Sequence, residues 1–331
     1  MKPQVVVVGS FVQDLMWKCT AFPGAGETII GSFVTGPGGK GSNQAVASGR
    51  AGARTAFIGA VGDDVFAEGA ARFHRAEGID AHFVRKGGQP TGTAAILVND
   101  AGQNEIVVAL GASALLRPGD VDAALIRGAK IVVCQHEANL PVNAHVFRVA
   151  RKAGVMTVLN PAPMRPDFDP AILRLTDVLI PNESEFVGLV RRVPRCAALV
   201  RGKDFRRRGP FCEETLSDLP FDSLHRLCRV LGVPTVIVTL GKRGCFLSQA
   251  DGVPVAIKGH RGIKVIDTTG AGDAFVGGFA AGFVKSGGNA EAAARLGNAV
   301  AALSVTKLGT APSMPSARDI ARFLGSRGRP R

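Results

Sequence analysis

The chain has 331 residues, of which 46% are hydrophobic and 20% are charged, and its formal net charge is +13. This length allows one large α/β domain with a smaller appendage, or two modest domains, and the composition excludes extended disorder. Because no apolar run approaches the roughly 20 residues that span a bilayer, we expect no transmembrane helix and no membrane partner.

The first residues and the cysteines both bear on where the protein works. The segment MKPQVVVVGSF has a short apolar run that ends at Gly9 without a small-residue cleavage site, so we interpret it as a first strand rather than a signal peptide. The six cysteines lie far apart, with no pair at the spacing of a metal site or a redox motif. Reduced thiols are therefore expected, which favours the cytoplasm and leaves open an organelle reached without a cleaved signal.

Much of the positive charge lies in one segment. Residues 191–208 carry eight Arg and Lys side chains and a single acidic residue, Asp204. We interpret 191–212 as a solvated surface insertion, because the chain has one Trp, no Tyr and no zinc-finger spacing with which to bind nucleic acid. No nucleic-acid partner is predicted.

Apolar runs typical of buried strands alternate along the chain with helix-like stretches. The strands are expected at 5–9, 55–62, 130–135, 155–160, 177–182 and 235–241, and the helices at 41–52, 63–77, 141–153, 183–190 and 222–232. This alternation predicts a parallel sheet covered by helices on both faces. Ligands of such sheets bind beyond the carboxyl ends of the strands.

Two stretches break this alternation. Residues 26–36, and the two runs that flank the AGQ turn within 92–110, have the pattern of half-buried antiparallel strands. We expect them to form a small separate sheet that acts as a lid. The predicted organisation is a core of 1–14, 41–90 and 111–331, with a lid of 15–40 and 91–110.

Three motifs carry candidate chemistry, and each also has a purely structural interpretation. TGPGGKGSNQAVASGRAG (35–52) is neither a P-loop nor a dinucleotide fingerprint, so it is either a glycine-rich turn or a place where the backbone approaches a ligand, with Lys40 and Asn43 facing it. PNESE (181–185) is equally a variant of a helix cap. DTTGAGDAF (267–275) is a glycine-built turn before a helix, or an anion site at the helix start.

The order and spacing of these three motifs resemble the ribokinase family of sugar kinases, also called PfkB, from about Val5 to Pro315. The resemblance implies a ribokinase-like α/β fold, with a mostly parallel central sheet covered by helices on both faces and a small β-sheet lid. It also implies ATP-dependent phosphorylation of D-ribose to D-ribose 5-phosphate. A kinase of this family for another sugar or a nucleoside, such as fructose or adenosine, is the alternative.

The resemblance assigns roles to individual residues. Gly270, Ala271 and Gly272 would form an anion hole for the transferring phosphoryl group, and Asp273 would take the proton from the sugar hydroxyl. The sugar would be bound by Asp14, Gly39, Lys40, Asn43, Glu137 and Asp273. The nucleotide would be bound by Asn182, Thr239, Gly241, Gly272 and Asn298.

Two ions and a partner are implied as well. Glu185 would hold Mg²⁺ through water, and K⁺ would be bound by Asp267, Thr269, Ser304, Lys307, Gly309 and Ser313, several of them through backbone carbonyls. The family's lids imply a homodimer. One position departs from the family pattern: Val12 stands where bacterial members often have Asn, which predicts that one sugar hydroxyl is read less strictly.

Overall fold

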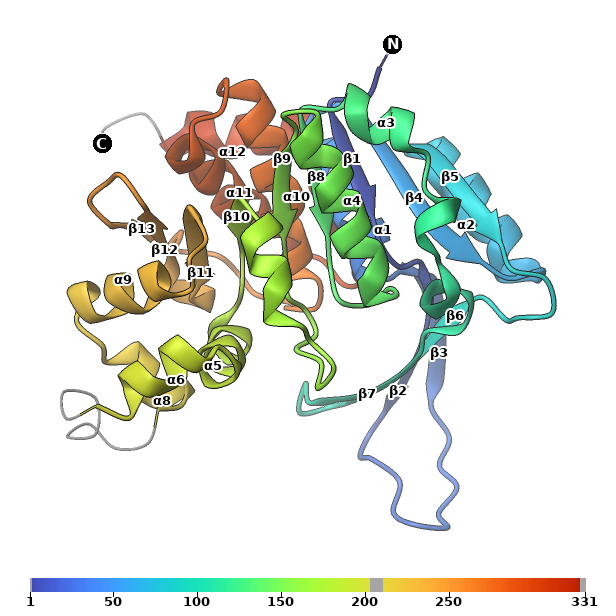
Figure 1. Ribbon diagram of the computed structural model, residues 1–331. Coiled ribbons are helices and arrows are strands. Elements are labelled where there is room, and N and C mark those ends of the chain that lie inside the picture. Colours follow the sequence, from blue (N-terminus) through green and yellow to red (C-terminus); the bar gives the residue numbers. More distant parts are fainter. Residues whose placement is uncertain (1, 203–210, 328–331) are drawn as a thin grey trace.

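The computed structural model describes residues 2–202 and 211–327 and contains two β-sheets (Figure 1). The large sheet has nine strands in the order β13-β12-β11-β10-β9-β8-β1-β4-β5, and the small sheet has the order β3-β2-β6-β7. The large sheet is parallel except for β12 and β13, which pair antiparallel at one edge. The predicted α/β architecture, with a mostly parallel sheet and a small second sheet, is confirmed.

The bounds of the regular elements follow. The large sheet is built from β1 (Val5–Val8), β4 (Thr55–Val61), β5 (Asp80–Arg85), β8 (Ile131–Cys134), β9 (Met156–Leu159), β10 (Val178–Leu179), β11 (Thr235–Thr239), β12 (Gly244–Gln249) and β13 (Val255–Lys258). The second sheet is built from β2 (Val12–Cys19), β3 (Ser32–Gly38), β6 (Gly92–Asn99) and β7 (Asn104–Ala109). The α-helices are α1 (Lys40–Arg50), α2 (Val65–Ala76), α3 (Ala123–Gly128), α4 (Leu140–Lys152), α5 (Glu183–Arg192), α6 (Pro194–Val200), α8 (Glu213–Ser217), α9 (Phe221–Val230), α10 (Ala271–Lys285), α11 (Ala290–Ser304) and α12 (Ala317–Arg327).

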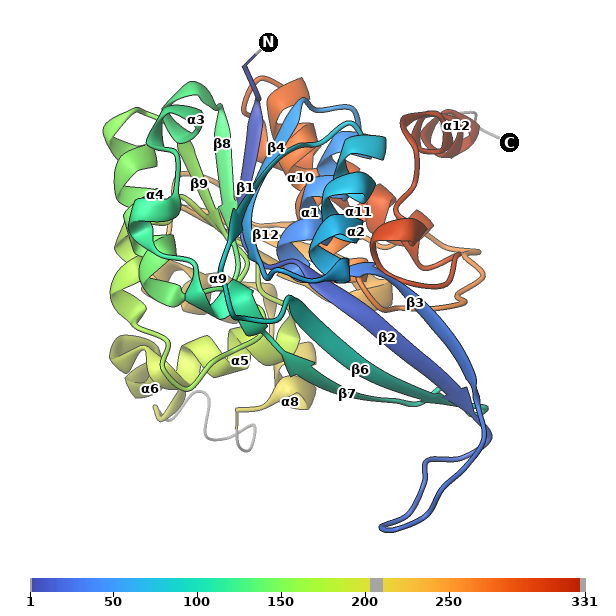
Figure 2. The same cartoon turned by 90° about the vertical axis from the view of Figure 1, so that its right-hand side faces the viewer.

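Both faces of the large sheet are buried, which explains its continuous apolar strands. In β1, Val5 and Val7 pack with α1, α2, α10 and α11, while Val6 and Val8 pack with α3, α4, α5 and α9. Figure 2 shows these two helical layers on opposite sides of the strands. Successive side chains of a strand point to opposite faces, so four consecutive valines supply both cores.

The second sheet departs from the sequence prediction in two ways. Residues 26–31 are not a strand, because β3 begins at Ser32. Strand β2, which was not predicted, pairs with β6 in parallel, whereas the hairpin predicted around the AGQ turn is confirmed, since β6 and β7 pair antiparallel. The reason is topological: β2 and β6 both leave the large sheet outward, after β1 and β5, while β3 and β7 return antiparallel beside them (Figure 2).

The Arg-rich segment is more ordered than the sequence predicted. The interpretation of 191–212 as an insertion without pattern is wrong for its first half, because α5 continues to Arg192 and α6 occupies Pro194–Val200. Cys196 is fully buried there, with Leu199 and Val200 packed against the same core. This is the i, i+3, i+4 spacing of a helix face, which the neighbouring arginines obscured. Arg206, Arg207 and Arg208 lie outside the described residues.

Two further sequence predictions concern membranes and thiols. None of the helices in 2–202 and 211–327 combines the length and the apolar character that a membrane span requires. All six cysteines carry free thiols, and five of them are buried.

Helices α1 and α10 pack unusually close together. A Cβ atom on Gly277 of α10 would overlap the Gln44 carbonyl oxygen and the Ala47 Cβ of α1, and would lie 2.9 Å from the Ser48 nitrogen. Glycine therefore sets the separation of the two helices. The close packing also brings their amino ends together.

We expect Gly277→Ala to lower the free energy of unfolding by about 1–3 kcal/mol, because the added methyl group overpacks this contact. Gly69→Ala in α2 is the matched control, since a Cβ there meets no atom within 4 Å. That variant should be neutral or more stable by up to about 1 kcal/mol, through helix propensity. Urea unfolding followed by circular dichroism measures both, and equal effects of the two substitutions would contradict the proposed overlap.

Candidate active site

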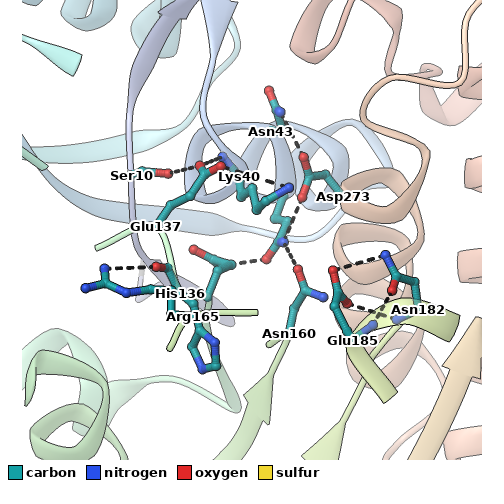
Figure 3. Close-up of polar contacts among 12 residues, drawn as sticks. Ser10, Lys40, Asn43, His136, Glu137, Asn160, Arg165, Asn182, Glu185 and Asp273 are labelled. Carbon is teal, nitrogen blue, oxygen red and sulfur yellow. Dashed lines mark hydrogen bonds and ion pairs between the residues drawn. The ribbon is translucent and has the colours of Figure 1, made fainter. Parts of the chain in front are cut away.

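The predicted site residues gather where strand ends of the large sheet meet the amino ends of α1 and α10 (Figure 3). A cavity of about 150 Å³ lies there, with Lys40, Asn160, Asn182, Glu185 and Asp273 among its lining residues. A larger cavity of about 420 Å³ adjoins it, and both cavities are lined by Thr239 and Gly272. The smaller cavity is mainly polar, whereas the larger has many apolar lining residues.

Asp273 is a buried carboxylate in the first turn of α10. Its Oδ2 accepts a hydrogen bond of 2.9 Å from Asn43 Nδ2, and its Oδ1 accepts one of 2.9 Å from Gln44 Nε2. Burial raises the pKa of Asp273, while Lys40 and the two amides act in the opposite direction. The carboxylate is thus fixed at both oxygens and more basic than a solvated Asp.

Gly270 and Gly272, which precede Asp273, differ in what glycine contributes at each position. Gly270 caps α10 with φ 77°, a left-handed conformation that favours glycine. A Cβ on Gly272 would meet nothing within 4 Å, so this first-turn residue borders open space. The Ala271 N–H donates to the Thr268 carbonyl at 3.2 Å, so one of the three predicted anion-hole amides already has a partner.

Lys40 lies among several carboxylates. Glu137 Oε2 accepts hydrogen bonds from the Lys40 backbone N–H at 2.9 Å and from Ser10 Oγ at 2.7 Å, and Glu137 Oε1 is 4.0 Å from Lys40 Nζ. Burial disfavours the ammonium, but Asp273, Glu137, Glu185 and Asp14 outweigh it and raise the pKa of Lys40. Lys40 is therefore a cation held in place by its neighbours.

Asp14 enters the site from the second sheet. Burial raises the pKa of Asp14 to about 6, although a hydrogen bond of 2.9 Å from Thr310 Oγ1 opposes the shift. Gly38 makes room for this side chain, since a Cβ at Gly38 would overlap the Asp14 carboxylate. Nearby, Asn43 Oδ1 is buried without a hydrogen-bond partner, which leaves an acceptor open to a ligand.

The PNESE motif forms the helix cap that the sequence allowed, and it also borders the cavity. Asn182 Oδ1 accepts from the Glu185 N–H at 2.8 Å, and Glu185 Oε2 accepts from the Asn182 N–H at 2.9 Å. Burial raises the pKa of Glu185. Within the described ranges no three His, Cys, Asp or Glu side chains gather to hold a metal directly. A magnesium ion near Glu185 would therefore fit only as a hydrated ion shared with a ligand.

The residues predicted to bind the nucleotide line the larger cavity. Thr239 ends β11, Gly241 follows it, and Asn298 projects from α11. Asn298 Nδ2 donates to the Lys258 carbonyl at 2.9 Å, which ties α11 to the end of β13. The structure thus brings these three residues to one cavity, although they come from distant parts of the chain.

The two segments predicted to bind a monovalent cation lie side by side. Asp267 Oδ1 accepts from the Thr269 N–H and Oδ2 from the Gly309 N–H, each at 2.9 Å. The Ile266 N–H donates to the Val305 carbonyl at 2.8 Å. The hydroxyls of Ser304 and Ser313 donate to the carbonyls of Ala301 and Thr310, and the Lys307 N–H donates to the Ser304 carbonyl. The geometry is compatible with a site made of carbonyls, and the cation remains a prediction.

Sequence reasoning missed several residues that complete the site: Ser10, Gln44, Gln135, Asn160 and Thr310. Asn160 directly follows β9 and Ser10 lies two residues after β1, so the rule that ligands bind beyond strand ends could have identified them. Gln44 was inside the glycine-rich motif but received no role. Thr310 gave no signal of its own, because its contact with Asp14 joins residues 296 positions apart.

Comparison with known proteins gives a consistent result. A sequence profile described as pfkB family carbohydrate kinase matches residues 2–207 and 218–317. Over 322 residues the chain is 36% identical to the ribokinase of Mus musculus, covering 96% of this chain and 93% of that protein. Over 330 residues it is 32% identical to the deoxyribokinase of Salmonella typhimurium, covering 97% and 98%. The structure of Arabidopsis thaliana ribokinase complexed with ribose and ATP matches with a TM-score of 0.81 at 30% identity, covering 98% of this chain and 99% of that one.

We expect Thr310→Val to raise the pKa of Asp14 above its value of about 6, because the substitution removes the hydroxyl that stabilises the carboxylate. The carboxyl ¹³C shift of labelled Asp14, followed as a function of pH, measures the change. Ser316→Ala, which removes a hydroxyl that donates to the exposed Asp319, is the control and should leave the Asp14 titration unaltered. An unchanged midpoint in Thr310→Val would contradict the interpretation of this contact.

Proposed function

Because the chain belongs to the pfkB family of carbohydrate kinases, we propose that it transfers the γ-phosphoryl group of ATP to D-ribose, giving D-ribose 5-phosphate and ADP. The single observation that carries the proposal is Asp273, a buried carboxylate held between two amides at the start of α10 and facing a polar cavity. The matches to ribokinases over nearly the whole chain support the same substrate.

The two cavities suit the two substrates. The larger cavity has the volume of a small-molecule site, and its apolar walls suit an adenine ring. Asn298 and Gly241 line this cavity and are available for polar contacts. ATP bound there would extend its phosphates toward Gly272 and Thr239, where the cavities meet. The sugar would lie on the other side of Asp273, against Asp14, Asn43 and Glu137, whose oxygens accept hydrogen bonds from hydroxyl groups.

The reaction needs a base, an in-line approach and stabilisation of negative charge. Asp273 accepts the proton of the sugar hydroxyl while the hydroxyl oxygen forms a bond to the γ-phosphorus. The bond between the γ-phosphorus and the β–γ bridging oxygen breaks, and its electrons leave with ADP. The Lys40 ammonium and the first-turn amide of Gly272, whose residues line the same cavity as Asp273, would stabilise the charge of the transferring group. Burial keeps the Asp273 carboxylate more basic than a solvated Asp.

We also propose the two ions implied by the family resemblance. Mg²⁺, bound through water near Glu185 and Asn182, would neutralise phosphate charge, and a monovalent cation would sit between the segments 267–269 and 304–313. Support comes from the buried carboxylate of Glu185 beside the polar cavity and from the hydrogen bonds of Asp267 that align the two segments.

A homodimer through the second sheet is proposed as well, in which this sheet serves as the lid. Its support is the exposed apolar surface of that sheet, where Phe33 is 51% and Val107 is 73% exposed, and the exposed Ile30 in the adjoining loop. A cytoplasmic location is proposed from the six free thiols.

Asp273→Asn should lower kcat by about 10²-fold or more, because the amide cannot accept the proton, while the KM for the sugar changes only a few-fold. ADP release in a coupled assay measures both constants. Asp80→Asn is the control, since that exposed carboxylate pairs with His82 on β5 and lines neither cavity. Turnover at the unmodified rate in Asp273→Asn would rule out the base.

We expect D-ribose to give the highest kcat/KM and 2-deoxyribose to follow within about tenfold. Val12 packs with Met16, Ala94 and Ile96 and offers no polar group, so one hydroxyl loses a partner that Asn would supply. Steady-state rates with ribose, 2-deoxyribose, fructose and adenosine test this order. Should fructose or adenosine be preferred, the kinase assignment survives and the ribose assignment does not.

A further inference from the structure

We propose that Gln44 is a positioning residue for the base, which fixes the Asp273 carboxylate through a chain of buried side-chain amides running from the ends of β8, β9 and β10. The inference rests on the proposed function, because it concerns how the base of that reaction is held. Gln44 belongs to α1 and is fully buried, and it lies 229 positions before Asp273 in the sequence.

The side-chain amide of Gln44 uses all of its hydrogens and its carbonyl oxygen. Its Nε2 donates to Asp273 Oδ1 at 2.9 Å and to Asn160 Oδ1 at 3.0 Å. Its Oε1 accepts from Gln135 Nε2 at 2.6 Å. An amide group has two N–H donors, so both are accounted for.

The direction of this amide follows from its neighbours. Asn160 Nδ2 donates to the Ile180 backbone carbonyl at 2.8 Å, and a carbonyl can only accept. Asn160 must therefore present Oδ1 to Gln44, which in turn must present Nε2 both to Asn160 and to Asp273. A flipped Gln44 would set its carbonyl oxygen against two other oxygens.

The far end of the chain is anchored in the large sheet. Asn143 Nδ2 of α4 donates to the Gln135 carbonyl at 2.7 Å, and Gly9 leaves the space that Gln135 Oε1 fills, since a Cβ at Gly9 would overlap that atom. Residues at the ends of β8, β9 and β10 thus orient the Gln44 side chain, and Gln44 in turn orients the Asp273 carboxylate.

Neutral amides are suited to this role. They hold the carboxylate and favour its ionised form without placing another charge beside it. The charged groups that already face Asp273 are Lys40 from α1, Glu137 after β8, Glu185 from α5 and Asp14 from β2. A further cation would make Asp273 a weaker base, and a further anion would keep it protonated.

Two variants test the role of Gln44. Gln44→Met keeps the volume and removes both donors, so the titration midpoint of Asp273 and the acid limb of kcat/KM should move together to higher pH. We expect a shift of about half a unit or more and a loss of kcat of roughly 10- to 100-fold at neutral pH. Gln44→Glu should shift both further, because two adjacent carboxylates share one proton, and its activity should recover as the pH rises.

Gln135→Met is the matched control, because it removes an equally buried amide of the same chain without touching Asp273. It should shift the Asp273 midpoint and the acid limb by less than Gln44→Met does, because Gln44 keeps both of its donors to Asn160 and Asp273. The midpoint is read from the carboxyl ¹³C shift of labelled Asp273, assigned with Asp273→Asn, and folding is checked by circular dichroism.

The outcomes separate this proposal from the function on which it rests. Failure of the unmodified protein to phosphorylate any sugar overturns the proposed function, while the ¹³C titrations still decide the role of Gln44. An Asp273 midpoint that is the same in folded Gln44→Met as in the unmodified protein overturns the positioning role. So does an equal shift in Gln135→Met, which would indicate a general effect of loosening the core.

Discussion

The site depends on one constraint, the close packing of α1 against α10. Glycine at 277 lets the backbone of α1 approach α10 through Gln44 and Ser48, and glycine at 41 lets the start of α1 approach the end of β1, where a Cβ would lie 2.8 Å from the Ser10 nitrogen. These contacts bring Asn43 and Gln44 within hydrogen-bonding distance of Asp273. The position of the proposed base therefore depends on how the two helices pack, because the donors that hold the Asp273 carboxylate come from α1.

Burial disfavours the ionised form of the Asp273 carboxylate. One cation, Lys40, and neutral hydrogen-bond donors stabilise that form. Four acidic side chains influence Lys40, and their combined effect keeps the ammonium charged despite burial. Glu137 is in turn stabilised by the Ser10 hydroxyl and the first backbone amide of α1. Asp273 receives two amide hydrogen bonds, and Asp14 receives one from a hydroxyl. Asp273, Glu137 and Asp14 are thus each held by different donor groups.

Much of the fold and part of the site could be predicted from local sequence. Four consecutive valines predict a strand buried on both faces, and the glycines before Asp273 predict a glycine-built turn at a helix start. Both patterns could be recognised because each lies within a few neighbouring residues. The parallel pairing of β2 with β6 could not be predicted, since it depends on where two distant strands leave the large sheet. Helix α6 was not predicted, because the charged residues around it obscure the helical spacing of its buried apolar residues. The hydrogen-bond partners of Asp273 and Asp14 could not be predicted, because those residues are distant in the sequence and meet only in the folded chain.

The residues proposed to select the substrate and those proposed to catalyse the reaction come from different parts of the molecule. The residues proposed for catalysis, Asp273, Lys40 and the helix-start amides, come from α1 and α10, whose packing tolerates little change in volume. Asp14, which is proposed to bind the sugar, comes from β2, a strand of the second sheet that has only a small core of its own with Val12, Met16, Ala94 and Ile96. Under the proposed function, a substitution at Val12 would change the contact with one sugar hydroxyl without displacing Asp273, because Val12 packs in the separate core of the second sheet.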